Sequence, residues 1–175
     1  MTAQKSSPLQ FRTGFIVLPL AFFTISAVLA AAFWGSLPDE VYYRFTTGGD
    51  PGSSLVAKGS VVAVVLLIQA ALLLLSFLLT WSLGRSRFFN ENLKNFWFNP
   101  TKLLTLMGNM PAIVQVIIAY ALLDIIIYHT QESHLVPLWL FALVTLVLGG
   151  VFILVYALPI FLQAWRGFSE TDKKE

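Results

Sequence analysis

Residues 60–83 read SVVAVVLLIQAALLLLSFLLTWSL, a run of apolar side chains that contains no charge. A helix needs about 20 residues to cross a hydrocarbon core of about 30 Å, and this run is long enough. It lacks the alternation of apolar and polar residues that marks the strands of a membrane barrel. The run therefore predicts a membrane-spanning helix.

Three further apolar runs are of comparable length and cover residues 14–34, 111–128 and 137–165. The last would be about 43 Å long as a helix, so we expect it to tilt or to project beyond the membrane. Gln69, Gln115 and Thr145 are polar groups suited to hydrogen bonds between helices. We expect residues 1–175 to form a single all-α membrane domain, a bundle of four transmembrane helices.

The composition supports a membrane protein. The chain is 57% apolar and 11% charged, with a mean hydropathy of +0.77, whereas soluble domains are about 45–50% apolar and about 25% charged. A soluble fold of 175 residues has too little interior to bury this much apolar surface. Cysteine is absent, which excludes disulfides, thiolate nucleophiles and cysteine-based metal sites.

The positive charges predict the orientation in the membrane. Arg44 and Lys58 lie between the first two runs, and the other nine of the 11 Lys and Arg residues lie before the first run, between the second and third, or after the fourth. Those nine are Lys5, Arg12, Arg85, Arg87, Lys94, Lys102, Arg166, Lys173 and Lys174. By the positive-inside rule, both termini are expected in the cytoplasm of a cell whose cytoplasmic membrane holds the protein.

The first apolar run has a second interpretation. Lys5 and Arg12 precede it and Ala30, Ala31 and Ala32 lie within it, which is the arrangement of a cleavable signal peptide. The run is longer than the usual apolar region of a signal peptide, so a retained span is favoured.

The connection between the second and third runs, residues 84–110, contains an amphipathic stretch. Its apolar side chains recur at the spacing of one helix face, at Phe89, Leu93, Phe96 and Trp97. With basic neighbours, this face predicts a helix in the membrane interface. There are two alternatives. One is a connector whose aromatic residues lie in the interfacial belt of the membrane, and the other is a docking surface for a protein partner.

Asp124 is the one formal charge inside a predicted span. Tyr120 and Tyr128 lie four residues before and after it, so these side chains share one helix face. A carboxylate inside a membrane is costly and indicates a functional site. Because Asp124 is about one turn from the outer end of its run, a hydrogen-bonded structural role is the alternative to a proton or ion site.

Both histidines belong to the short second outer connection. His129 and His134 are five residues apart, with Glu132 between them. This spacing does not put two metal ligands on one helix face, and neither histidine lies inside a predicted span. We therefore expect no bound metal and no cofactor.

The polar loop of residues 36–59 is the segment most suited to binding. It reads SLPDEVYYRFTTGGDPGSSLVAKG and combines a strand-like segment with a dense turn cluster. We expect it to fold over the outer helix ends. Its candidate binding residues are Asp39, Tyr42, Tyr43, Arg44, Phe45 and Asp50.

The first span, this loop and the start of the second span resemble the membrane domain of unknown function at the N-terminus of bacterial SdpI-type proteins. That family has Leu-Pro after its first helix, a Pro-x-His-Phe segment, a Gly-x-Pro-Asp turn and Ser-Lys before its second helix. Tyr42, Arg44 and Gly52 stand where the family has Pro, His and Asp. The matching residues are Leu37, Pro38, Asp39, Val41, Phe45, Gly49, Pro51 and Lys58. The resemblance implies a prokaryotic cytoplasmic-membrane protein and, in the SdpI branch, toxin immunity and signalling.

The residue patterns favour a non-enzymatic membrane protein whose outer loop senses or binds something, with the lipid bilayer and a membrane or cytoplasmic protein as partners. The alternatives are an accessory subunit of a transport or electron-transfer complex and a small transporter that uses Asp124. No catalytic triad, paired carboxylates or phosphate-binding loop indicates an enzyme. Nucleic-acid binding is not indicated, because topology explains the few basic residues.

Overall fold

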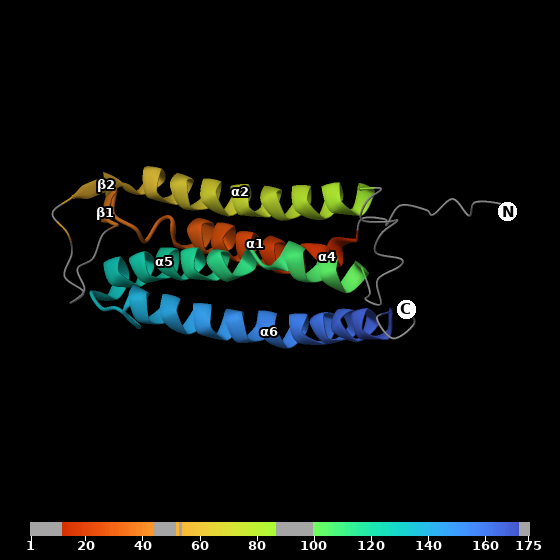
Figure 1. Cartoon of the computed structure of the whole chain (residues 1–175). Helices are drawn as coiled ribbons and strands as arrows, with labels where there is room; N and C mark the ends of the chain where they lie inside the picture. Colours follow the sequence, from red (N-terminus) through yellow and green to blue (C-terminus); the bar gives the residue numbers. More distant parts are fainter. Residues whose placement is uncertain (1–11, 44–51, 53, 87–99, 172–175) are drawn as a thin grey trace.

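The computed structural model describes residues 12–43, 52, 54–86 and 100–171, with the side chains at 100, 160, 161 and 163–171 left out of the description. The long helices lie side by side (Figure 1), and the described ranges also contain a short 3-10 helix and a shorter α-helix. The helices are η1 (Thr13–Phe15), α1 (Val17–Phe33), α2 (Lys58–Arg85), α4 (Pro100–Asn109), α5 (Ala112–Gln131) and α6 (Leu138–Thr171).

Among the described residues, three helical stretches are long and apolar enough to cross a membrane, namely Lys58–Arg85, Thr101–Gln131 and Leu138–Pro159. The prediction of a multi-pass membrane protein is confirmed at this level. Helix α1 has 17 residues, which correspond to about 25 Å. Helix α1 is therefore shorter than the helix predicted from the apolar run of residues 14–34. That α1 crosses the membrane as a fourth span stays a prediction.

The second helical stretch begins about ten residues earlier than the sequence predicted. Helix α4 leads into α5 through a turn at Met110 and Pro111, where the proline lacks the N–H that an unbroken helix needs. Leu104 is fully buried, and α4 packs against α2 and η1. Helix α4 thus joins the helix bundle. The interfacial position of residues 84–110 stays a prediction, and the predicted amphipathic stretch 89–97 lies outside the described residues.

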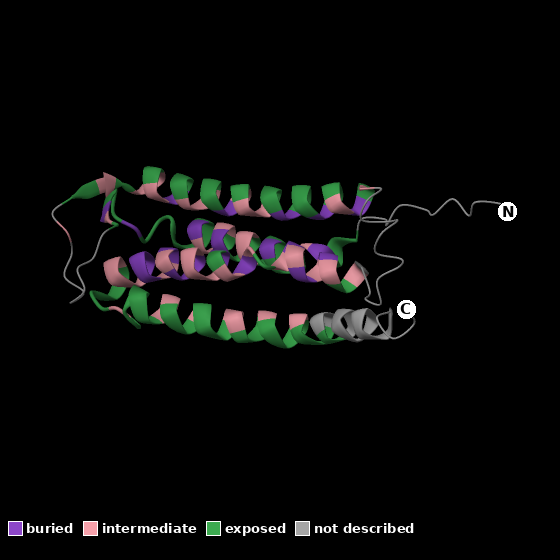
Figure 2. Ribbon diagram, viewed as in Figure 1, coloured by how far each residue is buried: buried purple, intermediate pink, exposed green. Residues whose placement is uncertain are grey.

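Helix α5 is the central helix, because it contacts α1, α2 and α6 (Figure 2). Gln69 on α2 donates from Nε2 to the Gln115 carbonyl on α5 and to Ser26 Oγ on α1, each at 3.0 Å. Gln115 donates from Nε2 to the Gln69 carbonyl at 3.0 Å. All three side chains are fully buried. These bonds confirm the polar contacts expected between helices for the two glutamines.

Helix α6 packs mainly on α5 and none of its residues from Leu138 to Pro159 is buried. Gly149 allows close approach, because a Cβ there would lie 2.7 Å from Ile113 Cδ1. Near the start of α6, the Phe141 ring stacks on Tyr120 with centroids 3.8 Å apart. The small residue at 149 thus serves helix packing, as small residues commonly do in membranes.

The polar loop between α1 and α2 contains a hairpin. Strand β1 (Glu40–Tyr42) pairs antiparallel with β2 (Leu55–Ala57), so that Val41 lies opposite Val56. Val41 is 1% exposed and belongs to the same apolar cluster as Leu122 and Ile126 of α5. The hairpin therefore covers one end of the helices, which we call the hairpin end (Figure 1).

Candidate functional site

Lys58 fastens the polar loop where α2 begins. Its Nζ donates to the Leu37 carbonyl at 3.0 Å, lies 3.2 Å from Asp39 Oδ1 and stands 5.5 Å above the Trp34 ring. Its backbone N–H donates to the Asp39 carbonyl at 2.9 Å. The Asp39 side chain is 99% exposed, so this ion pair adds little to stability. The backbone contacts hold the two ends of the loop together.

His129 joins the hairpin to α5. The Tyr42 N–H donates to His129 Nε2 at 3.1 Å. Nδ1 of the same ring lies 2.8 Å from the Ile125 carbonyl. Because Nε2 accepts, Nδ1 must carry the proton and donate to that carbonyl, so the ring in this arrangement is neutral. The sequence placed His129 beyond the third span, whereas α5 continues to Gln131 and His129 lies in its last turn.

His134 pairs with the buried carboxylate of Asp124. Its Nδ1 lies 2.9 Å from Oδ2 and 3.0 Å from Oδ1, and Asp124 is 4% exposed. Glu132 makes this contact possible, because its left-handed backbone (φ 54°) ends α5 and turns the chain back over the helix. The structure therefore supports a hydrogen-bonded Asp124, which was one of the two sequence interpretations.

Tyr120, one helical turn before Asp124, binds the same connection between α5 and α6. Its hydroxyl donates to the Val136 carbonyl at 2.6 Å and accepts from the Val136 N–H at 3.0 Å. Tyr120 and Asp124 thus both point towards the α5–α6 connection, which agrees with the shared face expected from their spacing.

The two predicted sites lie at the same end of the molecule. Aromatic rings connect them: Tyr42 to His129 with centroids 6.1 Å apart, His129 to Tyr128 at 5.4 Å, and Tyr128 to His134 at 4.8 Å. We call Tyr42, Asp124, Tyr128, His129 and His134 the polar cluster. It is continuous from the hairpin to the buried carboxylate, and the sequence did not indicate this continuity.

Two other candidate residues of the loop belong to the described ranges. Asp39 contacts Lys58, and Tyr43 is 39% exposed. Arg44, Phe45 and Asp50 lie outside the described residues. The sequence did not indicate the histidines as site residues, because their spacing was considered only for a metal pair. The signal for His134 is its position in the short connection after Asp124, where a hydrogen-bond donor can reach the carboxylate.

The chemistry of the polar cluster is that of hydrogen bonding. Within the described ranges, no group of three or more His, Asp or Glu side chains is placed to hold a metal ion. Asp124 accepts from Nδ1 of His134 and fixes the orientation of that ring, as carboxylates do for histidines in many sites. The cluster therefore links the outer hairpin and the α5–α6 connection to α5 through two histidine rings.

Comparisons with protein-family models, with curated proteins and with solved structures give no match for this chain. The function must therefore be argued from the polar cluster and the helices around it.

Proposed function

We propose that this chain is a non-enzymatic, four-span protein of a prokaryotic cytoplasmic membrane that senses conditions outside the cell through its hairpin end. The single observation that carries the proposal is the hydrogen bond from the Tyr42 N–H to His129 Nε2. It joins the backbone of the outer loop to one side chain of the central helix. The resemblance of the loop to the SdpI-type membrane domain supports a sensing role.

The orientation follows from the charged residues at the two ends. Arg12, Arg85 and Lys102 lie at the end where α1 begins and α2 ends, whereas Lys58 lies at the hairpin end. With η1 and Arg12 at the cytoplasmic surface, α1 forms the first and shortest span. This placement puts both termini in the cytoplasm and the polar cluster on the outer side.

Cysteine labelling tests this orientation, and the cysteine-free chain makes it simple. Ser133 and Thr13 are exposed at opposite ends. We expect Ser133→Cys to react with a membrane-impermeant maleimide in intact cells, and Thr13→Cys to react only after the cells are permeabilised. Labelling of Thr13→Cys in intact cells would contradict the proposed topology.

Removing the His129 ring is expected to release the hairpin from α5. The variant His129→Phe takes away the acceptor of the Tyr42 N–H. Removing one such bond, worth about 1 kcal/mol, corresponds to roughly a fivefold loss of protection for that amide. Hydrogen exchange of Tyr42 in the unaltered chain and in His129→Phe, corrected for intrinsic rates, measures the change.

The same experiment contains its control. The Glu132 N–H donates to the Tyr128 carbonyl, an acceptor that the substitution leaves in place, so its protection should not change. A Tyr42 amide that is equally protected in His129→Phe and in the unaltered chain would refute the role of His129 in holding the outer loop.

An accessory subunit of a larger membrane complex is the second candidate, and α6 favours it. None of the α6 residues from Leu138 to Pro159 is buried, so the helix has ample surface for a neighbouring subunit. Purification in mild detergent that yields only this chain would argue against the subunit role. The transporter hypothesis has less support, because His134 occupies both carboxylate oxygens of Asp124.

A further inference from the structure

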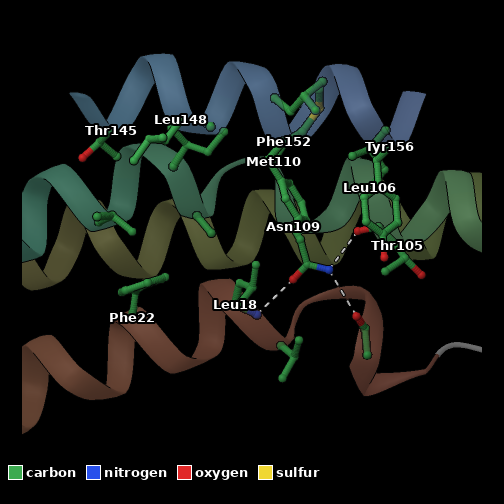
Figure 3. Close-up of a pocket in the computed structure, with 17 residues that line it drawn as sticks. Leu18, Phe22, Thr105, Leu106, Asn109, Met110, Thr145, Leu148, Phe152 and Tyr156 are labelled. Atoms are coloured by element: carbon green, nitrogen blue, oxygen red, sulfur yellow. Dashed lines mark hydrogen bonds between the residues drawn. The ribbon is translucent and has the colours of Figure 1, made fainter. Parts of the chain in front are cut away.

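A lateral groove lies between α1 and α6, towards the end opposite the hairpin (Figure 3). The junction of α4 and α5 forms its floor. Its cavity volume is about 680 Å³. Leu18 and Phe22 line the α1 side, Met110 lies on the floor, and Leu148, Phe152 and Tyr156 line the α6 side.

Two polar side chains of α4 in the groove are already hydrogen-bonded. Asn109 Oδ1 accepts from the Leu18 N–H at 2.9 Å, and its Nδ2 donates to the Gly14 carbonyl at 3.1 Å and the Thr105 carbonyl at 2.8 Å. The Thr105 hydroxyl donates to the Thr101 carbonyl at 2.8 Å. Since both amide donors of Asn109 are used, the α4 side of the groove suits a hydrocarbon occupant.

The length of the groove matches one leaflet of a bilayer. Along α6 it extends from Thr145 to Tyr156, which corresponds to about 17 Å of helix. One leaflet contributes about 15 Å to a hydrocarbon core of about 30 Å. The groove therefore offers an extended acyl chain an apolar surface about as long as one leaflet is thick.

Two basic residues lie beside the end of the groove that faces away from the hairpin. Arg12 is exposed and precedes Gly14, which lines the groove. Lys102 is exposed one helical turn before Thr105, another lining residue. Basic residues at this depth attract the anionic headgroups of phospholipids.

We propose that the lateral groove binds one acyl chain of an anionic phospholipid, with the lipid phosphate beside Arg12 and Lys102. The bound lipid fills the space between α1 and α6 and stabilises α6, which otherwise packs mainly on α5. This inference requires that the chain lies in a membrane, but it does not depend on sensing at the hairpin end. Hydrogen exchange at Tyr42 should therefore be the same with and without the lipid.

Native mass spectrometry of the detergent-purified chain tests the proposal, with dioleoyl-phosphatidylglycerol or dioleoyl-phosphatidylcholine added as the probe. We expect one phosphatidylglycerol to remain bound at about tenfold lower lipid concentration than phosphatidylcholine. The double variant Arg12→Gln/Lys102→Gln should lose this preference while it keeps the groove. Equal retention of the two lipids by the unaltered chain would overturn the proposal.

Blocking variants test the place of binding. Thr145→Trp puts a large ring into the groove, and we expect it to weaken phosphatidylglycerol retention about tenfold. Leu148 lines the groove and is 64% exposed, so Leu148→Trp is a second blocking variant that the fold tolerates. Val147→Trp, at an exposed neighbouring position outside the groove, is the matched control. Unchanged retention in both blocking variants would refute the assignment. A purified chain that is a dimer, and that the blocking variants convert to a monomer, would also refute it, because a second copy and not a lipid would then fill the groove.

Discussion

Replacing His134 with alanine should lower the free energy of unfolding by about 3 kcal/mol, the upper end of what leaving a buried polar group without its hydrogen-bond partner costs. The variant leaves the Asp124 carboxyl group, which is 4% exposed, without the ring that contacts both of its oxygens. Unfolding by SDS titration in mixed micelles measures the loss.

Two other variants make this prediction specific. His129→Ala removes only neutral hydrogen bonds, so it should cost about 1 kcal/mol. The double variant Asp124→Leu/His134→Leu replaces the pair with apolar side chains and should recover most of the lost stability, because such replacements are often neutral. If His134→Ala costs no more than His129→Ala, the contact with Asp124 does not stabilise the fold.

Replacing Gly108 with alanine should also lower the free energy of unfolding by about 3 kcal/mol, the upper part of the usual range for overpacking. A Cβ at this position of α4 would overlap the carbonyl oxygen of Phe15 in η1 and lie 2.5 Å from Thr80 Cγ2 on α2. The carbonyl belongs to the backbone, so it cannot turn away as a side chain can. We expect α4 to move away from η1. The same SDS titration measures the resulting loss in the free energy of unfolding.

Two glycines of α6 are matched controls for Gly108. At Gly149 the added Cβ would meet the end of the Ile113 side chain at 2.7 Å, and this side chain can change rotamer. Gly149→Ala should therefore cost less than Gly108→Ala. At Gly150 a Cβ would meet nothing within 4 Å, and alanine favours the helix by up to about 1 kcal/mol. A Gly108→Ala variant as stable as Gly150→Ala would contradict the close packing of α4 on η1.

Part of the candidate site was predictable from the sequence. The spacing of Tyr120 and Asp124 placed them on one helix face, and the strand-like composition around Val41 indicated strand β1 but not its partner β2. The end of α5 was not predictable to the residue, because helix ends depend on local caps and not on hydropathy. His129 therefore belongs to α5 although its apolar run ends earlier.

The start of the second membrane-length stretch shows the same limitation. Polar residues such as Thr101, Lys102 and Asn109 indicated that the connection before Pro111 lies in the membrane interface. In the fold, Asn109 bonds to η1 and α1, and Leu104 is buried. Packing on α2 and η1 thus decided the position of α4, and a hydropathy pattern does not contain this information.

The sequence by itself determined that this is a helical membrane protein, because transfer free energies accumulate along each apolar run and do not depend on the neighbours. It also indicated Gln69 and Gln115 as contacts between helices. Only the tertiary structure decided which polar side chains meet at the hairpin end. Tyr42 and His129 are 87 residues apart, and Asp124 meets His134 through the left-handed turn at Glu132. Such contacts depend on how separate elements fold back on one another, and no local pattern encodes that geometry.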